Sequence, residues 1–286
     1  MAARDLVLVL MLVTLWGSTF TAMKIGVVDV PPLLINTLRF ALSAFPAILF
    51  IPRPNVPLWT LVSFALILFG VKFTVLFAAL KLGLPAGLAS IVLQVQVFFT
   101  IFFAFLLLGE RPSRMSMIGA GVALIGMLVF AEEKIENAAL LPFLLGLLAA
   151  LFWGFANIIV KKAKAPDILS FVVWASAIAT PVLFAASLIV DGPTRVFTIL
   201  AAPGWTTILV TLYLSFGATL FGYSVWNGLI SRYPVATVGP FALLIPVSGL
   251  ACGAIFLGET FSVQAMIASA IVFLGLMINV FGAGSS

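Results

Sequence analysis

LWGSTFTAMKIG, residues 15–26, lies inside an apolar run that begins at Leu6. FWGFANIIVKKA, residues 152–163, repeats its skeleton, because in both stretches a Trp-Gly pair is followed by Lys eight residues after the Trp. A cleavable signal peptide has an apolar core of about 7–15 residues. The first run is longer than that, and its second copy lies in the middle of the chain. The pattern therefore predicts a membrane-embedded chain with two related halves.

The composition places the chain in a lipid bilayer. Of its 286 residues, 64% are hydrophobic and only 8% are charged, whereas soluble globular proteins carry about 25% charged residues. The net charge is +5, and the basic residues are scattered between apolar runs. This distribution is typical of a cytoplasmic bias of Lys and Arg and not of a nucleic-acid-binding surface. The single cysteine, Cys252, excludes an intrachain disulfide framework.

Ten segments have the length and apolar character of a membrane-spanning helix, which takes about 20 residues. Several begin at or near a proline, where the missing amide hydrogen leaves no helical bond unmade. The predicted spans are residues 5–27, 31–51, 57–80, 85–108, 114–131, 138–161, 167–190, 203–228, 234–257 and 262–282. We therefore expect an all-α polytopic membrane protein.

The Lys and Arg residues between the spans indicate the orientation in the membrane. Eight of them fall on one side and four on the other. The larger group is Arg4, Arg53, Arg111, Arg114, Lys161, Lys162, Lys164 and Arg232, and the smaller is Lys24, Lys81, Lys134 and Arg195. Because cytoplasmic loops carry the excess, both termini are expected in the cytoplasm.

The two halves share more than the Trp-Gly-Lys skeleton. A Gly-Glu pair at residues 109–110 recurs at 258–259, at an offset of 149 residues, and Pro85 and Pro234 precede the two pairs at the same offset. Five spans fall in each half. Because five is odd, the second half enters the membrane from the opposite side, and inverted repeats of this kind are typical of secondary transporters.

We place the two five-helix repeats at residues 1–137 and 138–286. Pro46 and Pro181 also correspond, but at an offset of 135 residues. The change of offset requires a net insertion of about 14 residues, which we expect in the loops around the span 203–228.

These motifs resemble the drug/metabolite transporter superfamily, in its ten-helix EamA-type branch, over essentially the whole chain. The resemblance rests on WGSTFTAMKIG (16–26), PPLLINTLRFALSAFPA (31–47), GLPAGLASIVLQVQVFFTIFFAFLLLGER (83–111) and the second Gly-Glu pair. Within the family, the sequences of the second and fourth spans are most similar to those of amino-acid and metabolite exporters, including O-acetylserine/cysteine exporters. The resemblance implies ten helices around a central cavity that export small metabolites across a bacterial inner membrane.

Two cationic residues lie deep within predicted spans. Arg39 lies eight residues after Pro31 and Lys72 eight residues before Leu80, so each is about 12 Å from the outer end of its helix. No Asp or Glu lies at that depth, and an ionisable residue inside a membrane indicates function. We expect both to face a cavity and attract a substrate carboxylate, with snorkelling or bonds to backbone carbonyls as alternatives. Asn36, one turn before Arg39, is expected on the same face.

Aromatic residues are expected to form the apolar wall of this cavity. Trp16 and Trp153 lie too deep in their spans for an interfacial belt, and we assign them, with Tyr223, to substrate binding. Tyr223 belongs to a stripe of mostly hydroxyl residues in the eighth span, which can line a cavity or join helices. The stripe has a spacing of four and consists of Thr211, Ser215, Thr219, Tyr223 and Asn227. Trp226 is a further binding candidate because of its size.

Two amide residues are expected to give the substrate directional hydrogen bonds. These are Gln94 in the fourth span and Asn157, one turn after Trp153. Gln96 lies about 200° from Gln94 around an α-helix, so only one of the two can face the cavity squarely, and we favour Gln94.

Prolines interrupt three of the spans, at Pro46, Pro181, Pro240 and Pro246. Each removes a backbone hydrogen bond and favours a kink, so these are the expected hinges. The span 234–257 contains two of them, whereas its counterpart 85–108 contains none. We therefore expect the former to bend more during gating.

The chain contains no His, and no carboxylate lies in the middle of a span. Proton coupling through a carboxylate would have to use Glu110 or Glu259, which we assign instead to stabilising helix N-termini. A membrane-embedded enzyme would need a nucleophile with its base, or metal ligands, and the spans offer neither. No cofactor or metal is expected.

The function expected is secondary export of amino acids or related small metabolites by alternating access. The expected partners are a small-molecule substrate and the lipid bilayer, without nucleic acid, and a monomer is compatible with the sequence. One alternative is a broad-specificity exporter of apolar or cationic drugs, held by cation–π contacts. The other is a membrane scaffold without transport activity.

Overall fold

The fold is an assembly of membrane-spanning helices. The computed structural model describes residues 2–136, 139–163, 167–233 and 238–282. Within these ranges nine helices are long and apolar enough to cross a membrane, a tenth apolar helix is shorter, and no strand occurs. The all-α polytopic fold is therefore confirmed. The start of the predicted span 234–257 lies outside the described residues, as does residue 138.

Several spans are divided by short 3₁₀ or π-helical stretches, labelled η, between their α-helical parts. The elements of the first half are α1 (Ala3–Asp29), α2 (Pro32–Ala44), η1 (Ala47–Leu49), α3 (Leu58–Phe64), η2 (Ala65–Lys72), α4 (Phe73–Lys81), α5 (Ala86–Val92), η3 (Leu93–Val95), α6 (Gln96–Leu108) and α7 (Arg114–Glu136). Those of the second half are α8 (Leu140–Ala163), α9 (Ile168–Val190), α10 (Pro193–Ala201), α11 (Trp205–Leu212), η4 (Tyr213–Phe221), α12 (Gly222–Arg232), η5 (Gly239–Leu243), α14 (Leu244–Leu257) and α15 (Val263–Gly282).

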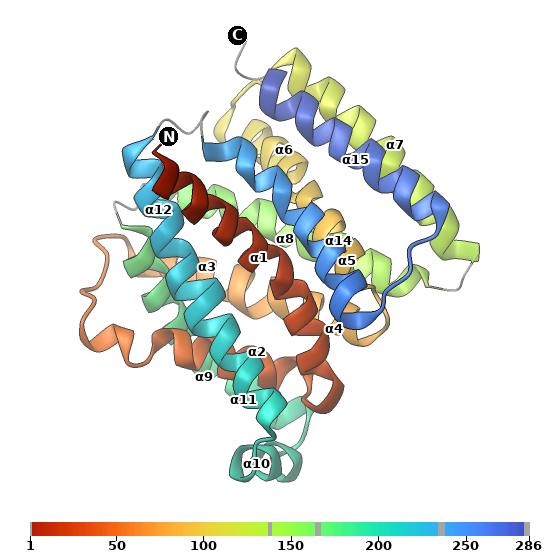
Figure 1. Cartoon of the computed structure of the whole chain (residues 1–286). Helices are drawn as coiled ribbons and strands as arrows, with labels where there is room; N and C mark the ends of the chain where they lie inside the picture. The colour runs from red at the N-terminus through yellow and green to blue at the C-terminus, as the bar shows by residue number, and fades with distance from the viewer. Residues whose placement is uncertain (1, 137–138, 164–166, 234–237, 283–286) are drawn as a thin grey trace.

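The two halves pack against each other through corresponding helices. In Figure 1, α7 and α15 run side by side, and α1 crosses α14. The reciprocal contact joins α8 to α6, and α2 packs against α9. The first span of each half therefore contacts the fourth span of the other half.

The glycine of each Trp-Gly pair lies at one of these crossings. A Cβ on Gly17 would lie 2.8 Å from the backbone nitrogen of Gly249 in α14. A Cβ on Gly154 would lie 2.9 Å from the backbone nitrogen of Thr100 in α6. Such distances leave no room for a side chain, so the repeated glycine permits close helix packing at both crossings.

The repeated Gly-Glu pair ends the fourth span of each half. Gly109 and Gly258 terminate α6 and α14 in the left-handed conformation, with φ angles of 69° and 63°. The amide of Glu110 donates to the carbonyl of Ala104 at 3.3 Å, and Glu259 repeats this bond at its own helix end. Glycine is the residue that adopts this helix-ending conformation without steric penalty.

The third span of each half contains a π-helical stretch, η2 and η4. The two stretches end at Lys72 and Phe221, the same offset of 149 residues as the Gly-Glu pairs. Long π-helical stretches are rare, and π-bulges are frequent at functional sites. In the connection before the eighth span, where the repeat offset changes, the short helix α10 is present.

The prolines lie at different kinds of position. Pro46 follows the end of α2 and precedes η1, so it separates two helices, whereas Pro181 lies inside the continuous α9. Pro240 is in the 3₁₀ stretch η5, and Pro246 is in α14. The proline-free fourth span also has a 3₁₀ stretch, η3, so the expected contrast with the ninth span is smaller than proline content suggests.

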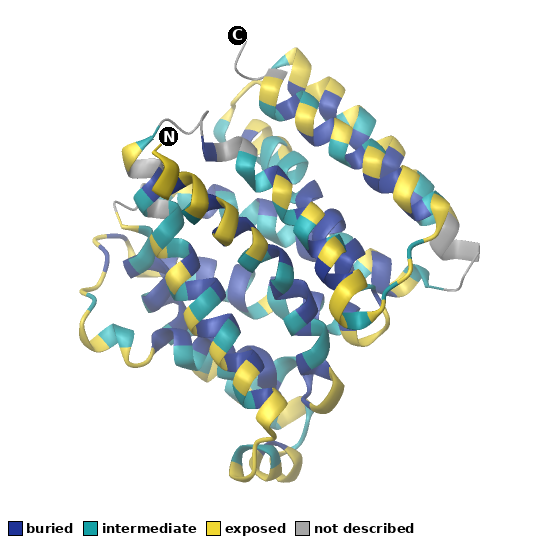
Figure 2. Ribbon diagram, in the orientation of Figure 1, coloured by how far each residue is buried: buried dark blue, intermediate teal, exposed yellow. Residues whose placement is uncertain are grey.

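Exposed residues on the outside of the bundle are largely apolar. Figure 2 shows exposed positions along the outer faces of α7 and α15, and these include Leu124, Leu128 and Met266. A soluble protein rarely exposes contiguous apolar surface of this kind, whereas lipid tails cover it at no penalty.

Candidate functional site

A cavity of about 540 Å³ lies between the two halves. Its lining includes α1, α2, η2 and η3 of the first half and α8, α9, α12 and α14 of the second. Eight of the nine residues assigned to substrate binding from the sequence line it: Trp16, Arg39, Lys72, Gln94, Trp153, Asn157, Tyr223 and Trp226. Residues from distant parts of the chain therefore line the same cavity.

Three aromatic side chains form a cluster on one wall. The ring centroid of Trp16 lies 6.0 Å from that of Tyr223 and 5.5 Å from that of Trp226, both at steep angles between the ring planes. The indole Nε1 of Trp16 donates to the carbonyl of Ala218 at 3.0 Å. Because this bond satisfies the buried indole N–H, it orients the ring from the second half of the chain.

Arg39 and Lys72 are buried in the cavity wall, with 5% and 2% of their surface exposed. Arg39 Nη2 donates to Thr219 Oγ1 at 3.3 Å, while its Nε and Nη1 have no hydrogen-bond partner among the described residues. The Arg39 Cζ lies 4.2 Å from the ring centroid of Phe73, and Lys72 Nζ lies 3.5 Å from the same centroid. Lys72 Nζ also lies 4.3 Å from the Trp153 ring. Snorkelling to the surface is thereby excluded for this conformation.

The position of Arg39 is fixed by the hydroxyl stripe of the eighth span. Ser215 Oγ donates to the Arg39 carbonyl at 2.8 Å. Thr219 accepts from the guanidinium and donates to the carbonyl of Leu214, five residues earlier, at 2.8 Å. The stripe therefore joins helices and also holds a cavity-lining cation, and the second role had no signal in the sequence.

Asn36 lies outside the cavity lining, contrary to the expectation that it shares a face with Arg39 there. Its side chain is fully buried, and Nδ2 donates to the carbonyl of Phe69 at 2.7 Å and to Thr74 Oγ1 at 3.2 Å. Phe69 belongs to the π-helical stretch η2, where α-helical carbonyl pairing is interrupted. Asn36 thus satisfies a backbone group of the segment that carries Lys72.

The amide side chains that line the cavity include both glutamines of the fourth span. Gln94 Nε2 donates to the carbonyl of Ala242 at 3.3 Å. Gln96 Oε1 accepts from Asn157 Nδ2 at 2.7 Å, and Gln96 also lines the cavity. The expectation that only Gln94 faces the cavity was wrong, because η3 is a 3₁₀ helix. In a 3₁₀ helix, residues i and i+2 are rotated by about 240° around the axis, instead of about 200° in an α-helix.

The lysines of the two repeated motifs lie at different kinds of site. Lys24 Nζ donates to the carbonyls of Leu80 and Leu84, at 2.6 and 3.1 Å, and so connects helix ends. Lys161 Nζ lies 2.6 Å from Glu110 Oε2 in a half-exposed ion pair, and it lines the cavity. Lys161 is therefore more than the helix anchor that its position at the end of a span suggests.

Glu259 stabilises a helix N-terminus in the opposite half. Its Oε1 accepts from the amide of Ala86 at 2.6 Å and its Oε2 from Gly87 at 2.9 Å. These amides begin α5, whereas the following helix α15 is capped by Ser262, whose hydroxyl accepts from Ala265. The structural role expected for Glu259 holds, but the helix is the fourth span of the first half.

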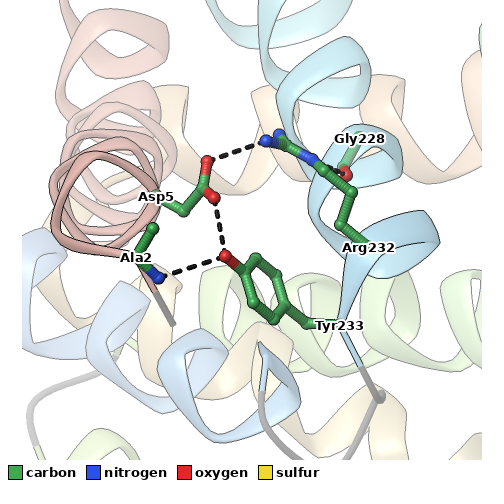
Figure 3. A network of polar contacts seen from close by, with 5 residues as sticks. All are labelled: Ala2, Asp5, Gly228, Arg232 and Tyr233. Atoms are coloured by element: carbon green, nitrogen blue, oxygen red, sulfur yellow. Dashed lines mark hydrogen bonds and ion pairs between the residues drawn. The ribbon is translucent and has the colours of Figure 1, made fainter.

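A further polar network joins the start of α1 to the end of α12 (Figure 3). The Asp5 carboxylate accepts from Arg232 Nη1 at 2.9 Å and from the Tyr233 hydroxyl at 2.7 Å. The amide of Ala2 donates to the Tyr233 hydroxyl at 3.1 Å. Asp5 is buried, and sequence reasoning did not single it out because it lies at the end of a span.

The chain is similar throughout its length to known transporters. The EamA-like transporter family matches twice, over residues 4–131 and 140–281. Proteins described as a probable amino-acid metabolite efflux pump, from Escherichia coli K12 and from Salmonella typhimurium LT2, are each 41% identical and cover 99% of this chain and 96% of their own length. A solved crystal structure shares the fold with a TM-score of 0.64 at 20% identity, over 98% of both chains. The protein is a membrane transporter that belongs to the EamA-like transporter family.

Proposed function

We propose that the protein exports amino acids or related small metabolites across the bacterial inner membrane. The observation that carries this proposal is the cavity of about 540 Å³ lined from both halves by cations, amides and aromatic rings. Its volume falls within the range of about 300–1,000 Å³ typical of small-molecule sites. The description of the two 41% identical relatives as probable amino-acid metabolite efflux pumps supports the same substrate class.

Transport proceeds by alternating access between two inverted repeats, divided near residue 138. The reciprocal contacts of α1 with α14 and of α8 with α6 support this arrangement, because each half offers the other an equivalent surface. With both termini cytoplasmic, Lys161 at the end of α8 lies on the cytoplasmic side. The cavity reaches Lys161, whereas the opposite end carries the bond between Glu259 and α5. In this orientation, the arrangement supports a cavity that opens toward the cytoplasm.

Each part of the cavity wall has a role in this proposal. Trp16, Trp153, Tyr223 and Trp226 contact the apolar part of the substrate, and Gln94 and Asn157 bond its polar groups. Arg39 and Lys72 make one region electropositive, and Asn36 acts indirectly by supporting η2. Gating uses the prolines of the spans, Pro46, Pro181, Pro240 and Pro246, as hinges.

The aromatic cluster around Trp16 favours a second candidate, export of apolar cations. Rings bind cations through their faces, and two of the centroid distances in the cluster are 6.0 and 5.5 Å. The two buried cations oppose this alternative by repulsion. A competition experiment separates the two substrate classes directly.

The test is counterflow exchange in proteoliposomes of the purified protein. Radiolabelled amino acids are offered to vesicles that contain the same unlabelled compound, and tetraphenylphosphonium is the competitor. We expect exchange of at least one amino acid, weak competition by the cation, and loss of exchange in Trp16→Ala. The exposed Trp205→Ala is the matched control. Exchange of the cation alone supports the second candidate, and no flux of any solute supports a scaffold.

A further inference from the structure

We propose that the cavity recognises the carboxylate of its substrate and does not require a substrate ammonium group. The transported class would then be small carboxylates with an apolar body, including amino acids whose amine is blocked. This inference rests on the proposed export function, because it assigns recognition to the same cavity. It follows from the distribution of charge around the wall.

The guanidinium of Arg39 has unused hydrogen-bonding capacity inside the cavity. Only Nη2 has a partner, the neutral hydroxyl of Thr219, while Nε and Nη1 have none among the described residues. A buried charged donor without a partner is strongly unfavourable. An anion that accepts from this edge of the guanidinium removes the penalty, and a carboxylate matches its geometry.

Lys72 supplies a second positive charge to the same place. In the part of the chain that the structure describes, its ammonium has ring contacts with Phe73 and Trp153 but no hydrogen bond or ion pair. Arg39 and Lys72 lie on the same Phe73 ring, at 4.2 and 3.5 Å from its centroid. The two cationic groups can therefore be no farther apart than these two distances together. One carboxylate with charge-assisted bonds of about 2.7–2.9 Å is suited to contact both.

The described lining of the cavity offers no carboxylate to pair with an ammonium group. Within the described ranges, no Asp or Glu belongs to its lining. Glu110, at the mouth, is already paired with Lys161. Apart from the cations, the polar lining consists of neutral amides, hydroxyl groups and aromatic rings, which bind a cation more weakly than a carboxylate does. Recognition is therefore strong at the acid end of an amino acid and weak at its amine end.

The two charges are not needed by the scaffold itself. The residue that corresponds to Arg39 at the offset of 135 is Trp174, and the one that corresponds to Lys72 at the offset of 149 is Phe221. Trp174 lies in α9 and Phe221 ends the π-helical stretch η4. The second half therefore forms the corresponding helix and π-helical stretch with aromatic residues at these two positions. The positive charge is therefore a feature of the cavity and not a folding requirement, and its presence in one half gives the bound substrate a single orientation.

The experiment compares three probes that differ only at the two ends of an amino acid. L-phenylalanine, N-acetyl-L-phenylalanine and phenethylamine are titrated into the purified protein by calorimetry, with empty micelles as the blank. We expect the first two to bind within about threefold of each other, and phenethylamine to bind at least about tenfold more weakly, as for loss of one charge-assisted bond. Equal binding of phenethylamine, loss of binding on acetylation, or no binding of either carboxylate overturns the inference.

Variants then locate the effect. Arg39→Gln and Lys72→Gln should each weaken both carboxylates at least about tenfold and leave phenethylamine unchanged or tighter. Arg195→Gln, an exposed cation on α10, should change none of the three. If a cavity variant does not fold, the comparison of probes on the native protein still decides. If amino acids are exchanged only when their ammonium group is free, this inference is wrong and the proposed function stands. If no amino acid is exchanged at all, the proposed function is wrong.

Discussion

Gly17 in the first half lies directly against Gly249 in the second, where α1 crosses α14. A Cβ on Gly17 would approach the Gly249 backbone nitrogen to 2.8 Å and the Ile245 carbonyl oxygen to the same distance. Both of these neighbours are backbone atoms, so relieving the steric clash requires a helix to move and not only the end of a side chain. This contact explains why the Trp-Gly pair is a structural requirement as well as a source of a cavity-lining ring.

Gly17→Ala should therefore lower stability by about 1–3 kcal/mol, the usual penalty for overpacking. The measurement is thermal unfolding of the purified protein in detergent. Gly121→Ala is the matched control, because a Cβ there meets nothing within 4 Å. Equal melting temperatures for the two variants would contradict the tight crossing.

Glu259→Gln should loosen the start of α5, since the carboxylate accepts from two backbone amides. Hydrogen bonds to a charged group contribute about 1.5–3 kcal/mol each, and glutamine retains part of this. We expect faster amide exchange over residues 86–92, measured by hydrogen–deuterium exchange. Glu110→Gln removes only a half-exposed ion pair, which is worth less than about 1 kcal/mol, and should leave that segment unchanged.

Thr219→Val should reduce substrate affinity without changing the fold. It removes the hydrogen bond that the Arg39 guanidinium makes to a side chain among the described residues and leaves the side-chain volume nearly constant. We expect a loss of about five- to tenfold in transport efficiency, which corresponds to one hydrogen bond. Thr219→Ser keeps the hydroxyl and should restore most of the activity. The two variants are compared by initial rates in proteoliposomes, and identical rates would show that Thr219 does not position Arg39.

Asn36→Leu should destabilise the π-helical stretch that carries Lys72. The Phe69 carbonyl would lose its amide partner, and an unsatisfied buried group costs about 1–3 kcal/mol. Faster hydrogen exchange over residues 65–72 and a lower melting temperature are the expected results. Thr37→Val, which removes a hydroxyl bonded only to its own helix, is the control. Unchanged exchange in Asn36→Leu would mean that the stretch is stable by itself.

The spans and the repeat could be predicted because both leave a mark on the linear sequence. A membrane helix needs a long apolar run, and the Gly-Glu pairs recur because only glycine ends the helices in that conformation. The shared depth of Arg39 and Lys72 could be predicted from their sequence positions, and the lack of an Asp or Glu at that depth favoured a cavity over snorkelling.

What could not be predicted depends on local departures from the α-helix. Nothing in the sequence of residues 65–72 distinguishes a π-helical stretch from an ordinary apolar helix, so the pairing of Asn36 with Phe69 was invisible. The 3₁₀ stretch at residues 93–95 changed the direction of Gln96 for the same reason. The partners of Gly17 and Glu259 lie in the opposite half, and sequence spacing carries no information about which half packs where.

The contact between Lys72 and Trp153 provides a built-in optical reporter. An ammonium group 4.3 Å from an indole centroid acts on the ring electrostatically, and the emission wavelength of tryptophan responds to such fields. An anion that draws Lys72 away or neutralises it should shift the Trp153 emission on binding. In a variant that keeps the cavity residues Trp16, Trp153 and Trp226 and replaces Trp59, Trp174 and Trp205 with phenylalanine, occupancy of the cavity could be followed in real time without any label.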